Sequence, residues 1–402
     1  MPPRRRALLI TPTAPATRGN GLAQRSAQWL DGLEGLHERV DTLVVPLSPT
    51  SPASLAARRR PSRGLETILD WRSAVQAMAC VADFASSLEG DVAAPLDTVV
   101  VQRSYLAPLL EPLLLTRAVG RAVRLLDLDD DETTTRQRIA VRLEARGRIA
   151  EAKEERRQAA RSSRVEARWL AEFSGLAVTS QGDAQVFLES MPHAVVGVVP
   201  NVVALPAISD GPRAVSEPIT LLLAGNLSYF PNEDAALFLA EEIWPRLTSL
   251  VPDVRVIVAG ADPPPSVRAL GDLQGWQVVA NPRMLDPIYQ AADIAVVPVQ
   301  AGGGTRIKLL EAMAYGLPVV STALGAEGLR VEHDRHLLIA DTPEAFAAEC
   351  ARLAGSADLR QRLARAGRER VADRYAPEDS TMAMRRLLER CRLGPRQGGT
   401  PS

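Results

Sequence analysis

The stretch Gly302-Gly303-Gly304-Thr305-Arg306-Ile307-Lys308-Leu309-Leu310-Glu311 decides how the second half of this 402-residue chain folds. The apolar run 293–299 before it is short and rich in β-branched residues, which predicts a buried strand. Residues 307–317 repeat apolar side chains at helical spacing, and 318–321 predict the next strand. The glycines therefore lie where a parallel strand turns into a helix, at the edge of the sheet where open α/β folds bind ligands.

The first turn of this predicted helix carries charges that a bare helix disfavours. Thr305 is predicted to be the N-cap, which places Arg306 and Lys308 at the first and third helical positions. Cations there oppose the helix dipole by about 0.3–1 kcal/mol each, and a bound anion would reverse that sign. Lys308 is also one of only two lysines among 47 basic residues. We therefore predict a phosphate site, with a surface turn held by a Lys308–Glu311 pair as the alternative.

The run 302–329 resembles the donor-site motif of family-4 retaining glycosyltransferases, in the subgroup with the pattern Gly-Gly-Gly-Thr-Arg-x-Lys. The resemblance implies a GT-B fold, which has two Rossmann-like α/β domains with parallel sheets. In that fold the domains face each other across a cleft, and a C-terminal helix crosses back to the first. The resemblance also implies that Glu311 binds the ribose hydroxyls of a donor. Many relatives carry a second glutamate eight residues earlier, where this chain has Gly303.

The length of the chain suits two domains of ordinary size. We predict an N-terminal Rossmann-like domain on the acceptor side at 1–205, completed by a C-terminal helix at 377–393. A segment rich in proline and serine predicts a linker at 206–218. The nucleotide-sugar donor domain is predicted at 219–376, and a disordered tail at 394–402.

The first turn of the predicted donor domain lacks the charges that its relatives use there. Relatives carry an arginine and a lysine in this turn, which grip the donor diphosphate. In this chain neither is present, and Asn226 and Ser228 offer only neutral hydrogen bonds. We therefore assign the grip, and the stabilisation of the leaving phosphate, to Arg306 and Lys308. Arg283 and Met284 are predicted to lie beside the nucleobase of the donor. The full set of remaining residues predicted to bind the donor is Gly225, Asn226, Arg283, Met284, Gly302, Gly303, Gly304, Thr305 and Glu311.

Two turns of the first domain are predicted to lie on the acceptor side. The turn Gly19-Asn20-Gly21 follows the first strand and resembles the glycine loop of the GT-B amino-terminal domain. Arg25 lies one helical turn later and is predicted to face the cleft. Arg103 follows the buried strand 97–101.

A third turn of this domain carries a cluster of acids after the strand 124–128. The resemblance implies that Asp127 and Asp130 hold acceptor hydroxyls or orient the cleft. One alternative is a divalent-metal site that includes Asp129. Another is a helix N-terminus lined with acids. Because GT-B relatives usually need no metal, the resemblance favours a protein without metal or cofactor.

The composition of the chain limits the cellular compartment and the kinds of partner that we expect. The net charge of −1 predicts no general attraction to nucleic acid. No apolar run approaches the roughly 18 residues of a spanning helix, and the three cysteines show no metal spacing, so we expect a cytoplasmic protein. Residues 136–168 carry 11 basic and 5 acidic residues. This surplus predicts a solvated helical face or, alternatively, peripheral contact with the inner face of an anionic membrane.

These features predict a retaining glycosyltransferase that moves a sugar from a nucleotide-diphosphate sugar to a hydroxyl acceptor. The acceptor would be a saccharide, a lipid-linked group or a small molecule. Two alternatives stay open. One is a non-catalytic nucleotide-binding subunit that activates a partner transferase, and the other is a GT-B sugar-nucleotide epimerase.

Overall fold

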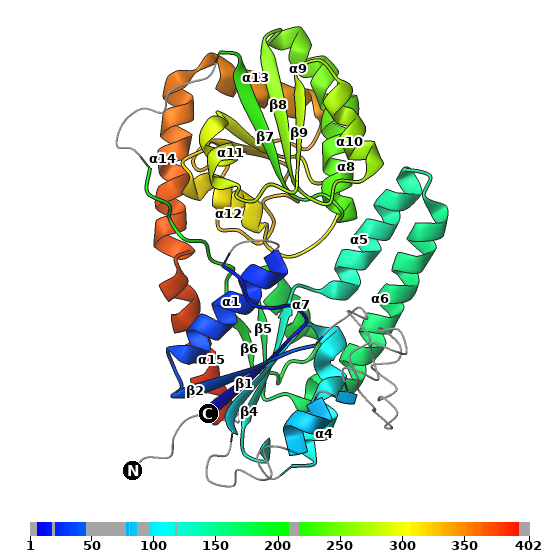
Figure 1. The fold of residues 1–402 in the computed structure, drawn as a ribbon, viewed down its shortest axis with the longest axis vertical. Coiled ribbons are helices and arrows are strands. Elements are labelled where there is room, and N and C mark those ends of the chain that lie inside the picture. The colour runs from blue at the N-terminus through cyan, green and yellow to red at the C-terminus, as the bar shows by residue number, and fades with distance from the viewer. Residues whose placement is uncertain are drawn as a thin grey trace, which may run out of the picture. The chain divides into compact units, whose positions relative to one another are not determined.

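The computed structural model describes residues 6–17, 21–45, 78–79, 81–86, 96–116, 119–208 and 217–393. Contacts within the chain divide it into two compact units, one made of residues 1–201 and 378–402 and the other of residues 202–377. Most of the predicted linker, at 209–216, lies outside the described residues, as does the predicted tail. Each unit is built on one parallel sheet with helices around it (Figure 1).

The sheet of the first unit contains six strands within the described residues, and every neighbouring pair is parallel. The run 7–10 shows why it folds this way, because its alternate residues enter two different cores on the two faces of the sheet. The chain order changes direction between β1 and β3, which makes that edge a topological switch point. Along the sheet the strands are β2 (Arg39–Val44), β1 (Arg6–Thr11), β3 (Leu96–Gln102), β4 (Val123–Asp129), β5 (Gly175–Val178) and β6 (Val196–Val198).

The helices of this unit include the last helix of the chain. Met384 and Leu387 of this helix pack in one core with Leu9 and Trp29, so the predicted return of the C-terminal helix to the first domain is confirmed. Gly147 separates two long helices, and its φ of 73° is a conformation that favours glycine. The described helical segments are α1 (Gly21–Glu34), η1 (Ser104–Leu110), α4 (Glu111–Leu114), α5 (Glu132–Ala145), α6 (Ile149–Trp169), η3 (Leu170–Glu172), α7 (Gln181–Ser190) and α15 (Pro377–Leu393).

The second unit repeats this architecture. Its described strands are again all parallel, and the chain order changes direction between β7 and β10. The fold class predicted from the sequence, two Rossmann-like units with parallel sheets, is confirmed. Along the sheet the strands are β12 (Leu338–Ile339), β11 (Val319–Ser321), β10 (Ile294–Val297), β7 (Ile219–Asn226), β8 (Val254–Ala261) and β9 (Trp276–Ala280).

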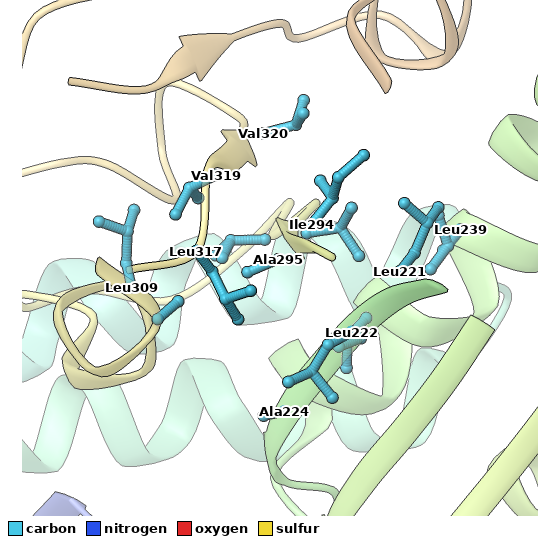
Figure 2. Close-up of a cluster of buried hydrophobic side chains, with 14 of the residues drawn as sticks. Leu221, Leu222, Ala224, Leu239, Ile294, Ala295, Leu309, Leu317, Val319 and Val320 are labelled. Carbon is cyan, nitrogen blue, oxygen red and sulfur yellow. The ribbon is translucent and has the colours of Figure 1, made fainter. Parts of the chain in front are cut away.

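One continuous core fixes the helix that follows the glycine turn. Figure 2 shows Leu317, just after α12, beside Ala295 of β10, and Leu309 of α12 belongs to the same core. The helix packs on β10 and β11. The described helical segments of this unit are α8 (Phe230–Phe238), η4 (Leu239–Ile243), α9 (Trp244–Leu250), α10 (Pro265–Arg268), η5 (Ala269–Asp272), α11 (Asp286–Ala291), α12 (Ile307–Ala314), α13 (Pro343–Gly355) and α14 (Ala357–Arg374).

The carboxyl ends of β7 and β8 meet through two glycines. Gly225 is paired in register with Gly260. A Cβ atom on Gly260 would lie 1.6 Å from the carbonyl oxygen of Gly225, so no side chain fits there without a backbone shift. The close approach fixes the path of the chain at the end of β7.

We expect Gly260→Ala to destabilise the second unit by about 1–3 kcal/mol, the usual cost of forcing atoms into a packed interior. Chemical unfolding measures the change. Gly355→Ala is the matched control, because an added methyl there meets nothing within 4 Å. Equal unfolding midpoints for the two variants would contradict the close approach.

Candidate functional site

The predicted donor residues converge where β7 and β10 end. Gly225 and Asn226 finish β7, while the glycine turn connects β10 to α12. Gly302 and Gly304 have φ angles of 105° and 68°, which explains why glycine occupies them. A Cβ atom on Gly302 would lie 3.5 Å from Cγ of Pro231, in the first turn of α8. The end of β7, the start of α8 and the glycine turn therefore form one edge, at the switch point of the sheet.

The N-cap of α12 is Arg306, so the prediction of Thr305 is wrong. The helix begins at Ile307, which puts Lys308 at its second position. The physical reason is the direction of the arginine. Its guanidinium turns back and donates to the carbonyl oxygens of Gly303 and Gly304, the latter at 3.0 Å. This bracing of the turn delays the start of the helix by one residue.

The half-buried Lys308 extends toward the end of β7. Its ammonium donates to Oδ1 of Asn232, and a Cβ atom on Gly225 would lie 3.4 Å from its Nζ. Burial, the largest effect, and the like charge of Arg306 lower the pKa of Lys308, and Glu311 opposes both. Together these effects lower the pKa of Lys308 to about 7. The site therefore holds a cation whose hydrogen-bond partner is a neutral amide.

Glu311, further along α12, is held by a pair of stacked tyrosines. The hydroxyl of Tyr289 donates to its Oε2 at 3.0 Å. Tyr289 is buried, which raises its pKa well above the usual value, so it stays a donor. Its ring stacks on Tyr315 with centroids 4.7 Å apart and planes at 6°, and Tyr315 in turn donates to Asp286 at 2.7 Å. The carboxylate is thus fixed by a structure that spans α11 and α12.

Of four further residues of the second unit, two have predicted roles that stay predictions, and two were missed by the sequence analysis. Arg283 and Met284 lie in the turn between β9 and α11, where Met284 is 53% exposed, and their contact with a nucleobase stays a prediction. Asn232 and Tyr289 were missed. A proline-asparagine pair at a helix start was the only available signal for Asn232, and nothing local marks Tyr289.

In the first unit, the structure directs Arg25 inward. Its side chain is 1% exposed and binds Asp127 through two bonds, Nη2 to Oδ1 at 2.7 Å and Nε to Oδ2 at 3.1 Å. Gln102 also donates to Asp127, at 3.1 Å, and accepts from Ser26 at 2.8 Å. This buried network lies under the switch point between β1 and β3. Of the predicted glycine loop, Gly21 begins α1, and Gly19 and Asn20 lie outside the described residues.

Arg103 lies among the acids that follow β4. Its guanidinium is 2.8 Å from Asp130 and 3.2 Å from Asp129. Burial raises the pKa of Asp129, and Arg103 opposes that shift. Asp131 caps α5 by accepting from the N–H of Thr134, which matches the helix-terminus interpretation of this cluster. Within the part of the chain that the structure describes, no group of three or more His, Cys, Asp or Glu is placed to hold a metal ion.

The basic stretch 136–168 forms α5 and α6, and several of its arginines pair with glutamates of the same two helices. Examples are Arg136 with Glu155 at 2.9 Å and Arg156 with Glu144 at 2.7 Å. Such pairs are typical of a solvated face. None of the helices within the described ranges is long and apolar enough to cross a membrane. Peripheral contact with an anionic membrane stays a prediction.

Comparison with known proteins finds a family match within the second unit. Residues 218–356 match the family described as glycosyl transferases group 1. The match covers about a third of the chain and most of the second unit. A curated relative, an uncharacterized 44.6 kDa protein in the cps region of Klebsiella pneumoniae, is 27% identical over 135 residues. That match covers 32% of this chain and 35% of the relative, so it spans about a third of either protein.

Solved structures resemble this chain over nearly its whole length. A sucrose-phosphate synthase from Thermosynechococcus elongatus has a TM-score of 0.67 at 18% identity, over 96% of this chain and 98% of its own. An α,α-trehalose 6-phosphate synthase from Burkholderia multivorans has a TM-score of 0.64 at 12% identity, over 96% of both chains. Anabaena HepE, solved with UDP and glucose, has a TM-score of 0.62 at 12% identity, over 96% and 99%. These likenesses show the expected GT-B fold.

We expect Arg25→Ala to destabilise the first unit by about 3–5 kcal/mol, because it leaves the buried Asp127 carboxylate unpaired. Urea unfolding measures the loss. Arg39→Ala is the control, since its pair with Asp41 is on the surface, where Arg39 is 60% exposed, and such pairs contribute about 0–1 kcal/mol. Full stability of Arg25→Ala with impaired activity would instead make Arg25 an acceptor-side residue.

Proposed function

We propose that this protein transfers a sugar from a nucleotide-diphosphate sugar to a hydroxyl group of an acceptor, with retention of configuration and without a metal ion. The observation that carries the proposal is the edge at the ends of β7 and β10. There a glycine turn, Arg306 and Lys308 come together at the switch point of the unit that contains the match to glycosyl transferases group 1. The acceptor would be a saccharide, a lipid-linked group or a small molecule.

The chemistry of this edge suits a diphosphate. The glycine turn gives a bound oxyanion close access to backbone N–H groups. Lys308 adds an ammonium beside Gly225, and its partner Asn232 does not neutralise it. Arg306 adds a second cation from the turn itself. Because the leaving diphosphate gains charge as the sugar departs, cations held in position beside it stabilise the transition state more than the ground state.

Glu311 suits the hydroxyls of a ribose. An ionised carboxylate only accepts hydrogen bonds and has room for several. The bond from Tyr289 takes one direction at Oε2 and fixes the orientation of the group. A preset carboxylate loses less entropy when a diol binds. HepE, a fold neighbour solved with UDP and glucose, supports a nucleotide sugar as the donor.

Two rival functions make different predictions at the same edge. A non-catalytic subunit would bind nucleotide tightly without turnover, whereas an epimerase would turn over the donor without transfer. A transferase hydrolyses its donor slowly when the acceptor is absent. An assay for sugar release from a panel of nucleotide sugars separates the three, and tight binding with no release would overturn the proposal.

We expect Glu311→Ala to weaken binding of a nucleoside diphosphate by about 10–100-fold, the range for hydrogen bonds that involve a charged group. Tyr289→Phe should weaken it less, by about tenfold or below, because it keeps the stack and removes only the bond that orients Glu311. Calorimetry measures both affinities. Wild-type affinity in Glu311→Ala would remove this residue from the site.

We expect Lys308→Ala to lower turnover at saturating donor by about 100-fold, the scale seen when one preorganised donor is removed. Its melting temperature without ligand should stay equal or rise, because a desolvated cation leaves the first turn of a helix. Arg306→Ala should lower turnover and also the melting temperature, since Arg306 braces the turn.

These turnover assays are run in chelator, as the proposal requires no metal. Unchanged turnover in Lys308→Ala with a lower melting temperature would make Lys308 structural. Activity that chelator removes and magnesium restores would contradict the metal-free mechanism.

A further inference from the structure

Asn232, in the first turn of α8, joins three parts of the proposed donor site. We call this site, at the carboxyl ends of β7 and β10, the donor edge. It is only 6% exposed. Its Nδ2 donates to the carbonyl oxygen of Asn226 at 2.6 Å, and its Oδ1 accepts from Lys308. Its own backbone N–H donates to the carbonyl oxygen of Tyr229 at 2.8 Å. These bonds hold both ends of the side-chain amide, so its direction is fixed.

The amide and the ammonium lie side by side over the end of β7. A Cβ atom on Gly225 would lie 3.1 Å from Nδ2 of Asn232 and 3.4 Å from Nζ of Lys308. Glycine therefore leaves this face of the strand to the two polar groups. A neutral amide at this place fixes the position of the lysine without fixing its charge.

We propose that Asn232 is a positioning residue that holds Lys308 beside Gly225 in a form that takes up a proton when a donor diphosphate binds. The inference deepens the proposed function and rests on it, since the anion is the donor diphosphate. The proton comes from solvent to the lone pair of Nζ, and no covalent bond to the ligand forms or breaks. When the diphosphate leaves, the proton returns to solvent.

The charges around Lys308 account for the direction of this coupling. Arg306, in the turn before α12, disfavours the ammonium, and Glu311, on α12, favours it. From β7 and α8 the facing groups are Gly225 and Asn232, which carry no charge. Burial is the largest effect, and the pKa of Lys308 is lowered to about 7. An anion within hydrogen-bond distance favours the charged form, so binding raises this pKa.

The direction in which affinity changes with pH follows from the linkage between proton uptake and diphosphate binding. Below pH 7 the free protein already holds the proton on Lys308, so binding takes up little. Between pH 7 and the higher pKa of the complex, the free lysine is mostly neutral and the bound one charged. Affinity for a diphosphate therefore falls as the pH rises above about 7.

The contact between Asn232 and Lys308 is tested without any ligand. The chain has only two lysines, Lys153 and Lys308, so lysine labelled with ¹³C at Cε gives two resonances. Lys308→Arg identifies which one is Lys308. We expect that resonance to titrate near neutral pH, and in Asn232→Asp about one to three pH units higher, the effect of an adjacent opposite charge. The same titration midpoint in wild type and Asn232→Asp overturns the role of Asn232.

The coupling to the anion is tested by calorimetry on the full chain, with UDP and then GDP as probes, in two buffers of different ionisation enthalpy. Lys308→Arg keeps its charge at all these pH values, so its proton exchange reports the probe alone, whose terminal phosphate ionises at about pH 6. Relative to Lys308→Arg, we expect wild type to take up nearly one more proton per diphosphate at pH 8 and almost none at pH 6. Binding to wild type without proton uptake at pH 8 overturns the inference and leaves the proposed function intact. Failure of every nucleoside diphosphate to bind overturns both, while the titration still decides the contact.

Discussion

The contact between Lys308 and Asn232 is the interaction on which the donor edge depends. It joins α12 to α8 over the end of β7, and the second bond of the amide ties the same side chain to the backbone of Asn226. A buried ammonium is costly unless a charge or strong hydrogen bonds compensate it. Here a neutral amide compensates only part of that cost, as the lowered pKa of Lys308 shows. The edge therefore keeps an unfavourable electrostatic term that a bound anion would remove.

The cations described in the two units donate to different kinds of group. In the first unit, Arg25 pairs with Asp127 and Arg103 with Asp130, each through a charged hydrogen bond of 2.7–2.8 Å. In the second unit, Arg306 donates to backbone carbonyls and Lys308 to an amide. Both edges lie at topological switch points, so topology alone does not distinguish them. The neutral amide partner of Lys308 does, and it supports the proposed anion site in the second unit.

The sequence predicted the elements that depend on local signals. The glycine turn after β10 follows from a short apolar run, helical spacing and glycine, all visible within a few residues. The return of α15 to the first unit was expected from the family resemblance and not from a local pattern. The missed features depend on pairs that lie far apart. Lys308 meets Asn232 across 76 residues, Tyr289 meets Glu311 across 22, and Arg25 meets Asp127 across 102. The prediction of the N-cap was wrong for a related reason. The direction of the Arg306 side chain set the start of the helix, and no local pattern encodes that direction.

The proposed uptake of a proton by Lys308 on donor binding bears on the chemical step. A lysine fixed as ammonium in the free protein would bind substrate and product diphosphate with equal readiness. A lysine that charges in response to the anion presents its full charge only while phosphate is present, and so acts where the charge of the leaving group grows. As the product diphosphate departs, desolvation by the protein again favours the neutral amine, and loss of the proton lowers the affinity that would slow release. Under the proposed function, the burial that penalises the charge of Lys308 in the empty site also eases the release of the product diphosphate.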